Sequence, residues 1–148
     1  MNENQKRSLK ALRIATASWA IMGLFLIPLF VFFDLGKGWR WEPHNAIYDQ
    51  MIVSIYVGLG LAMARAVGDP LANWSLLEFT VVSSMLHGAV MFVHAVVDPM
   101  HRGHLIGDVW ILAGALGLMI PMYQLRDFRP AGTAWGGDQV HVNESARP

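Results

Sequence analysis

Four of the six histidines and two aspartates lie in one stretch of the chain, residues 75–108. His87 and His94 are seven residues apart and Asp98 follows His94 by four, so on an α-helix the three side chains return to nearly the same face. His104 and Asp108 form a second pair at a four-residue interval. Imidazole nitrogens bind Zn, Cu and Fe, and a carboxylate can complete the ligand set or orient a ligating imidazole. The pattern therefore indicates an end of the protein that has the right donors for a metal.

Binding of a transition metal or of haem b is the first hypothesis for this cluster. A haem site within one chain would pair His94 with His104, because these residues come from neighbouring apolar stretches. A metal site would draw on a wider set: His94, His101, His104, Asp98 and Asp108, with His44 and Asp49 as further candidates. The spacing matches no compact motif such as H-E-x-x-H. The hypothesis therefore rests on residue types and on their shared end.

A polar stripe continues from the cluster into the apolar stretch 75–97. Its members are Thr80, Ser84, His87, Met91, His94 and Asp98. At 1.5 Å per residue, His87 lies about 16 Å deeper than Asp98, near the middle of a membrane span. Polar groups at that depth usually face other helices. We therefore expect His87 to be buried between helices and hydrogen-bonded to Ser84 or to a group on the preceding helix, which carries Tyr56 and Asp49.

Two other functions fit the same stripe. His87 and His94 would relay protons, or line a path for a small molecule, in an oligomer large enough to form a transporter. Alternatively, the stripe holds helices together through interhelical hydrogen bonds, and the His/Asp cluster is a solvated network at the helix ends. We favour this structural alternative. It predicts a non-enzymatic accessory or scaffolding subunit of a larger membrane complex, or a homo-oligomer.

The elements that position these residues are four long apolar runs. The chain is 54% hydrophobic and only 15% charged, with a mean hydropathy of +0.37, whereas soluble domains carry about 25% charged residues. The runs are Ile14–Phe33, Ala46–Ala66, Ser75–Val97 and His104–Tyr123. Each is close to the roughly 20 residues that a helix needs to cross a bilayer.

These runs predict an all-α fold, a four-transmembrane-helix bundle over residues 14–125. A basic juxtamembrane segment, residues 1–13, precedes the bundle and extends its first helix. The tail, residues 126–148, has too few apolar residues to fold alone, so we expect it to be disordered.

The distribution of lysine and arginine predicts the orientation. With both termini cytoplasmic, three basic residues lie outside, namely Lys37, Arg40 and Arg102. The other eight lie inside: Lys6, Arg7, Lys10, Arg13, Arg65, Arg126, Arg129 and Arg147. This bias follows the positive-inside rule. It places the His/Asp cluster on the outer side, which in a Gram-negative bacterium is the periplasmic side of the inner membrane.

Local signals predict details of the helices. Pro28 should kink the first span because it removes a backbone hydrogen bond. Small residues let helices approach closely, so the region of Gly58 and Gly60 on the second span should be a packing contact, as should Gly107, Gly114 and Gly117 on the fourth. Ser75 and Glu78 match the S-x-x-E capping box, so we expect Glu78 to cap the third span rather than to act in catalysis.

Several functional classes are excluded or disfavoured. The chain has no cysteine, which excludes disulfides and thiolate chemistry. Its formal net charge is zero, so nucleic acid is not an expected partner. No nucleophile elbow, phosphate-binding glycine loop or paired catalytic carboxylates are present. We therefore predict no catalytic residues, and the lipid bilayer is the one partner that composition indicates.

The chain also resembles a family of small, uncharacterised four-helix bacterial membrane proteins. The resemblance covers about residues 10–125 and is carried by QMIVSIYVGLG, ARAVGDPLANWSLLEF, SSMLHGAVM and HRGHLIGD. The matching positions are Gln50, Asp69-Pro70, Ser84, His87-Gly88, His104 and Gly107-Asp108. The resemblance implies the four-helix topology and draws attention to His87, His104 and Asp108. It implies no reaction.

Overall fold

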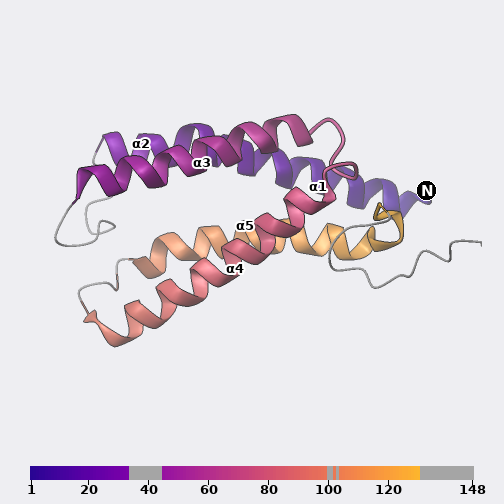
Figure 1. The fold of residues 1–148 in the computed structure, drawn as a ribbon. Coiled ribbons are helices and arrows are strands. Elements are labelled where there is room, and N and C mark those ends of the chain that lie inside the picture. Colours follow the sequence, from indigo (N-terminus) through magenta and orange to yellow (C-terminus); the bar gives the residue numbers. More distant parts are fainter. Residues whose placement is uncertain (34–44, 100–101, 103, 131–148) are drawn as a thin grey trace, which may run out of the picture.

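The computed structural model describes residues 1–33, 45–99, 102 and 104–130, without the side chains of residues 104 and 106–109. The described chain is all-helical, as predicted (Figure 1). Its long helices are α1 (Glu3–Ile21), α3 (Ala46–Ala66), α4 (Trp74–Val97) and α5 (His104–Gln124). The bounds of α3 are those of its predicted span, and α4 and α5 each differ from their own predicted spans by one residue.

The first helix begins earlier than its apolar run, as expected for an extension through the basic segment. Asn2 caps it: the Asn2 side chain accepts a hydrogen bond from the Gln5 N–H at 2.9 Å, and the Gln5 side chain accepts one from the Asn2 N–H at 2.8 Å. This capping box satisfies two backbone donors that a helix start leaves unpaired. The helix then continues through η1 (Met22–Leu26) and α2 (Ile27–Phe32) as one 30-residue unit.

The predicted distortion at Pro28 takes the form of a π-helical turn. Proline lacks an N–H, and its ring collides with the carbonyl four residues earlier in a regular α-helix. Here the preceding turn, η1, is widened, and the Ile27 N–H donates to the Met22 carbonyl five residues back. The helix therefore passes Pro28 without a break.

The capping box predicted at Ser75 and Glu78 was wrong. α4 begins at Trp74, so the N-cap position is Asn73 and Ser75 lies inside the first turn. The Asn73 side chain makes no cap because its Nδ2 donates to the Asp69 carbonyl at 2.8 Å. Glu78 is instead engaged in contacts between segments, which are described below.

The helices pack in the order α3, α1, α5, α4, with α1 and α5 in the middle. Figure 1 shows the α1–α3 pair lying over the α4–α5 pair, and the two pairs diverge away from the N-terminus. The core lies between them and is formed by apolar side chains, among them Leu12, Trp19, Met63, Leu77 and Leu118. Because α3 and α4 are the outer helices of this row, each keeps a broad exposed face.

Three helices are long and apolar enough to cross a membrane, counting within the described residues. They are Glu3–Phe32, Ala46–Ala66 and Trp74–Val97, each of which contains an 18-residue stretch with a mean hydropathy of 2.1, 1.4 and 1.7, respectively. The described side chains of α5 add a shorter apolar segment, Trp110–Gln124. Large apolar side chains are exposed along these helices, including Phe25, Ile55 and Leu86. Such a surface is typical of helices that contact lipid.

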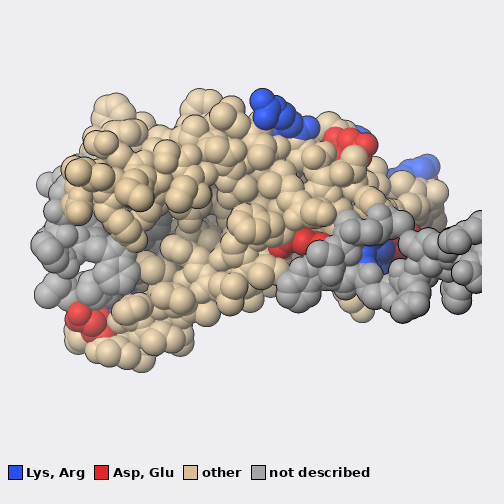
Figure 2. All heavy atoms as spheres, viewed as in Figure 1, with Lys and Arg blue, Asp and Glu red and all other residues tan. Residues whose placement is uncertain are grey.

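Charged side chains gather toward one end of the molecule. α1 begins, and α3 and α5 end, at this end, which carries all the described basic residues except Arg102, namely Lys6, Arg7, Lys10, Arg13, Arg65, Arg126 and Arg129. Figure 2 shows blue patches confined to this half, while most of the remaining described surface carries no charge. A charged end next to an apolar body fits a helix bundle whose apolar part lies in a membrane and whose charged end lies in water.

Candidate functional site: the exposed flank of helix α4

The polar stripe of α4 is divided between two faces of the helix. Thr80, Ser84 and Met91 are buried against neighbouring helices. His87 and His94 are exposed. Together with half-buried Ser83 and exposed Val90, they form a strip that we call the His87 face, namely Ser83, His87, Val90 and His94.

The buried face of α4 includes two of its smallest residues. Gly88 and Ala95 are buried, and a Cβ at Gly88 would lie 2.6 Å from Leu112 Cδ2 of α5. A side chain at position 88 would therefore force the Leu112 side chain to shift. With about 100° between successive residues, His87 and His94 lie roughly 70–90° away from the centre of this buried face.

The prediction that His87 is buried between helices and bonded to Ser84 was wrong for the single chain. Its imidazole is exposed, and no hydrogen-bond partner for it occurs among the described residues. Buried Thr80, by contrast, is satisfied within its own helix, because its Oγ1 donates to the Leu76 carbonyl at 2.8 Å. His87 is thus an exposed polar group in the middle of α4 to which the described part of the chain offers no hydrogen bond.

The exposure of both histidines also bears on the transport hypothesis. A relay inside one chain needs His87 and His94 to line an interior path, but both side chains point away from the core. A path would have to form between subunits, as the hypothesis already assumed.

The His/Asp cluster is described only in part. His94 is exposed and Asp98 is half-buried, and the Asp98 N–H donates to the His94 carbonyl at 2.9 Å. His101, and the side chains of His104 and Asp108, lie outside the described residues. Among the described side chains, no group of three or more histidine or acidic residues could hold a metal ion. Metal and haem binding therefore remain predictions.

The polar residues predicted on the second span lie on α3. Asp49, in its first turn, and Tyr56 are both half-buried. Both take part in interactions in this structure. Neither is exposed in the way that His87 is.

The packing contact expected in the Gly58 region of α3 is present, and Gly60 makes it. Gly58 itself is exposed, and a Cβ there would meet nothing within 4 Å. Gly60 is buried instead, and a Cβ there would lie 2.9 Å from the Leu24 nitrogen. Its counterpart is Gly23, where a Cβ would be 2.5 Å from the Tyr56 carbonyl oxygen. Gly114, by contrast, is a contact as predicted, because the Trp19 ring lies over it.

Sequence reasoning missed a contact that joins the C-terminal segment to α4. Glu78 Oε1 accepts a hydrogen bond from Trp74 Nε1 at 2.9 Å and lies 3.7 Å from Arg129 Nη1. Both charged side chains are mostly buried. The i,i+4 spacing of Trp74 and Glu78 was visible in the sequence, but nothing there connected Glu78 with Arg129.

The fold and this site define an all-helical protein with helices of membrane-spanning length and an exposed polar group within one of them. Residues 7–122 match a family of unknown function (DUF6632), and the chain belongs to that family. This confirms the expected membership of an uncharacterised family. No curated protein and no solved structure matches the chain.

Proposed function

We propose that this protein is a multi-pass membrane protein that acts as a non-enzymatic accessory or scaffolding subunit, and that it binds a transmembrane helix of another protein through the His87 face. The observation that carries the proposal is the exposure of His87 in the middle of α4. At 1.5 Å per residue, His87 lies about 20 Å from Trp74 and about 15 Å from Val97. Lipid tails offer no hydrogen-bond partner at that depth, so a polar side chain there favours a protein neighbour.

The composition of the His87 face supports a helix as that neighbour. Ser83 and Val90 flank His87 one turn away on either side, and both are small enough for close approach. Association of helices in lipid depends on close packing and on interhelical hydrogen bonds, each worth about 0.6–2 kcal/mol. The His87 face offers both. It provides affinity in the membrane without requiring any change in the chain's own core.

The proposal includes the placement of the protein in the membrane. The basic residues of α1, of the end of α3 and of the segment after α5 share one end. By the positive-inside rule this end is cytoplasmic, and so are both termini. We place the protein in the inner membrane of a bacterium, with the His/Asp cluster on the periplasmic side.

Size analysis of the protein extracted from its native membrane in a mild detergent tests the proposal. Wild-type protein should migrate in a complex larger than the single chain, and His87→Leu should migrate as the free protein. The matched control is Ser54→Ala, which removes an exposed polar group of α3 that is already bonded to the Met51 carbonyl of its own helix. This control should keep the complex. A wild-type protein that migrates alone, or a complex unaffected by His87→Leu, would contradict the proposal.

Metal or haem binding is the second candidate, and it is favoured by topology. α4 ends and α5 begins at the same end of the molecule (Figure 1). His94 lies in the last turn of α4 and His104 is the first residue of α5, so both positions lie at this end. Metal analysis and an absorption spectrum of gently purified protein, repeated on His94→Ala and His104→Ala, test it. A stoichiometric metal or a Soret band that either substitution removes would support this candidate, and an empty, colourless wild-type protein would refute it.

A further inference from the structure

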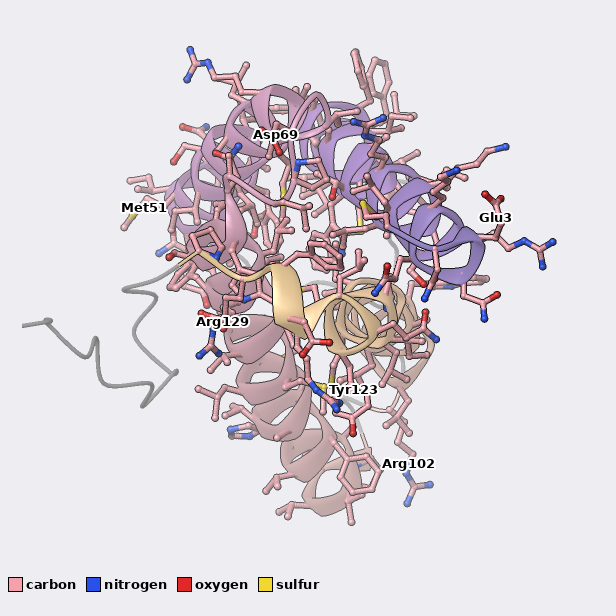
Figure 3. The ribbon with its side chains drawn as sticks, turned by 90° about the vertical axis from the view of Figure 1, so that its right-hand side faces the viewer. Glu3, Met51, Asp69, Arg102, Tyr123 and Arg129 are labelled. Atoms are coloured by element: carbon pink, nitrogen blue, oxygen red, sulfur yellow. The ribbon has the colours of Figure 1, made fainter. Side chains whose placement is uncertain are left out.

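An open pocket lies where α1 begins and α5 ends. Its volume is about 600 Å³, within the range of about 300–1,000 Å³ typical of ligand pockets. The walls include Arg7 and Ser8 of α1, Tyr123 and Gln124 of α5, and Arg126 and Asp127 of η3 (Arg126–Phe128). Figure 3 looks onto this end of the molecule, with Tyr123 labelled beside the last turn of α5. Residues near the start and near the end of the described chain thus line the same pocket.

The two helices are fixed to each other beside this pocket. Ser8 is buried, and its Oγ donates to Gln124 Oε1 at 2.6 Å. This hydrogen bond links residues 116 positions apart in the sequence. Because it lies within the lining, the separation of the pocket walls is set by the fold rather than by a ligand.

The charges of the lining favour a phosphate group. Arg7 is exposed and has no ion pair with any described carboxylate. The Arg126 guanidinium lies over the Tyr123 ring, with its Cζ 4.5 Å from the ring centre. A guanidinium held against an aromatic ring can still donate its N–H groups to an anion. Guanidinium groups bind phosphate through paired, charge-assisted hydrogen bonds. Asp127 supplies one negative charge, so the lining balances one phosphate diester better than a headgroup with two phosphates.

The position of the pocket along the helices indicates the source of the phosphate. Ile14, where the apolar run of the first helix begins, is six residues beyond Ser8, or about 9 Å further along the helix. Tyr123 belongs to the aromatic residues that favour the membrane–water interface. We therefore propose that this pocket binds the phosphate of a membrane phospholipid headgroup. The proposal is independent of the His87 face, which lies within the membrane span of another helix.

Binding of phosphatidylglycerol to the detergent-purified full chain, measured by native mass spectrometry, tests this proposal. The double variant Arg7→Gln/Arg126→Gln should bind it at least about tenfold more weakly, since the loss of even one charged hydrogen bond costs about a factor of ten. The control is Lys10→Gln/Arg65→Gln, which removes two exposed charges from the same end, outside the lining. It should bind like wild type. Diacylglycerol with the same acyl chains, which lacks the phosphate, should bind weakly to all three proteins.

Three outcomes would overturn the proposal. Equal losses in the two double variants would show a general effect of charge, and equal binding of diacylglycerol would show that acyl chains alone are recognised. Binding of inorganic phosphate as tight as that of phosphatidylglycerol, and lost only in the arginine variant, would assign the pocket to free phosphate. Arg7→Gln alone separates binding from folding, because Arg7 makes no described contact that stabilises the chain, and it should also weaken phosphatidylglycerol binding.

Discussion

Gly23→Ala should destabilise the protein, whereas the same substitution at Gly58 should not. At Gly23 the first helix crosses α3 so closely that a Cβ would lie 2.5 Å from the Tyr56 carbonyl oxygen and 3.0 Å from Gly60 Cα. Ordinary contact begins at 3.4 Å, so the two backbones would have to separate by up to about 0.9 Å. Both obstructing atoms belong to the backbone of α3, so no side-chain rotation relieves the contact. At Gly58 a Cβ meets nothing within 4 Å.

The size of the effect follows from two opposing terms. Alanine in place of glycine stabilises a helix by about 0.5–1 kcal/mol, because glycine loses more backbone entropy on folding. Overpacking a tight contact costs about 1–3 kcal/mol. Gly58→Ala should therefore be neutral or slightly stabilising. Gly23→Ala carries the same backbone gain, so the free energy of unfolding should differ by about 1–3 kcal/mol between the two variants.

Reversible unfolding in mixed detergent micelles, titrated with sodium dodecyl sulfate and followed by tryptophan fluorescence, measures this difference. Gly60→Ala, on the other side of the same crossing, should behave like Gly23→Ala, because its Cβ would lie 2.9 Å from the Leu24 nitrogen. Equal stability of Gly23→Ala and Gly58→Ala would refute the close crossing. So would a Gly58 variant that is the less stable of the two.

Three further predictions use the same unfolding assay. Ser8→Ala should lower the free energy of unfolding by about 1 kcal/mol, because it removes the hydrogen bond to Gln124. The control is Ser18→Ala, which removes a hydroxyl that bonds only within its own helix and should change this free energy by less than about 0.5 kcal/mol. Equal effects of the two substitutions would contradict the interhelical role of Ser8. Trp19→Phe should lower the free energy of unfolding by less than about 1 kcal/mol, because the buried indole N–H lacks a partner among the described residues. Trp19→Ala should lower it by about 3–5 kcal/mol, because it empties a buried site. A Phe variant as unstable as the Ala variant would mean that the indole N–H is hydrogen-bonded. Arg129→Ala should lower the free energy of unfolding by about 0.5–1 kcal/mol, because it breaks the mostly buried ion pair with Glu78. Lys6→Ala breaks the exposed ion pair with Glu3 and should leave the free energy almost unchanged. A larger effect of Lys6→Ala than of Arg129→Ala would contradict a stabilising contact between Arg129 and α4.

The helices and their bounds could be predicted from the sequence because their signals are local. The α3 span, Ala46–Ala66, is a mostly apolar run that starts directly after a capping residue, Asn45, whose side chain accepts a hydrogen bond from the Ile47 N–H at 3.0 Å. The first helix could be extended to the basic segment for the same reason. Length, polarity and capping residues are local properties of the sequence, so they can be recognised without knowledge of the fold.

The faces of the helices could not be predicted in the same way. In a soluble helix the apolar side marks the core, but lipid is as apolar as a core, so polarity does not separate the two sides of a membrane helix. We assumed that His87 would turn inward. Instead Gly88 faces α5, where a Cβ would lie 2.6 Å from Leu112 Cδ2. Gly58 and Gly60 are equally small, and only the position of the first helix determines which one is buried.

Contacts between distant segments escaped prediction altogether. Arg129 reaches Glu78, and Ser8 reaches Gln124, across separations that no local pattern encodes. The pocket between the start of α1 and the end of α5 likewise depends on residues far apart in the sequence. The predicted metal ligands have a different status, since His101 and the side chains of His104 and Asp108 lie outside the described residues.

Photo-crosslinking from two valines of α4 tests the proposed role of the His87 face most directly. Val90 lies one turn from His87 on that face, Val93 lies about 120° around the helix from His87 and outside that face, and both valines are 57% exposed. A photo-reactive residue at position 90, activated in the native membrane, should give a discrete adduct with another polypeptide, and His87→Leu should abolish it. The same residue at position 93 should give none. Equal labelling at both positions, an adduct of two copies of this chain, or an adduct that persists in His87→Leu would contradict an accessory subunit that docks through His87.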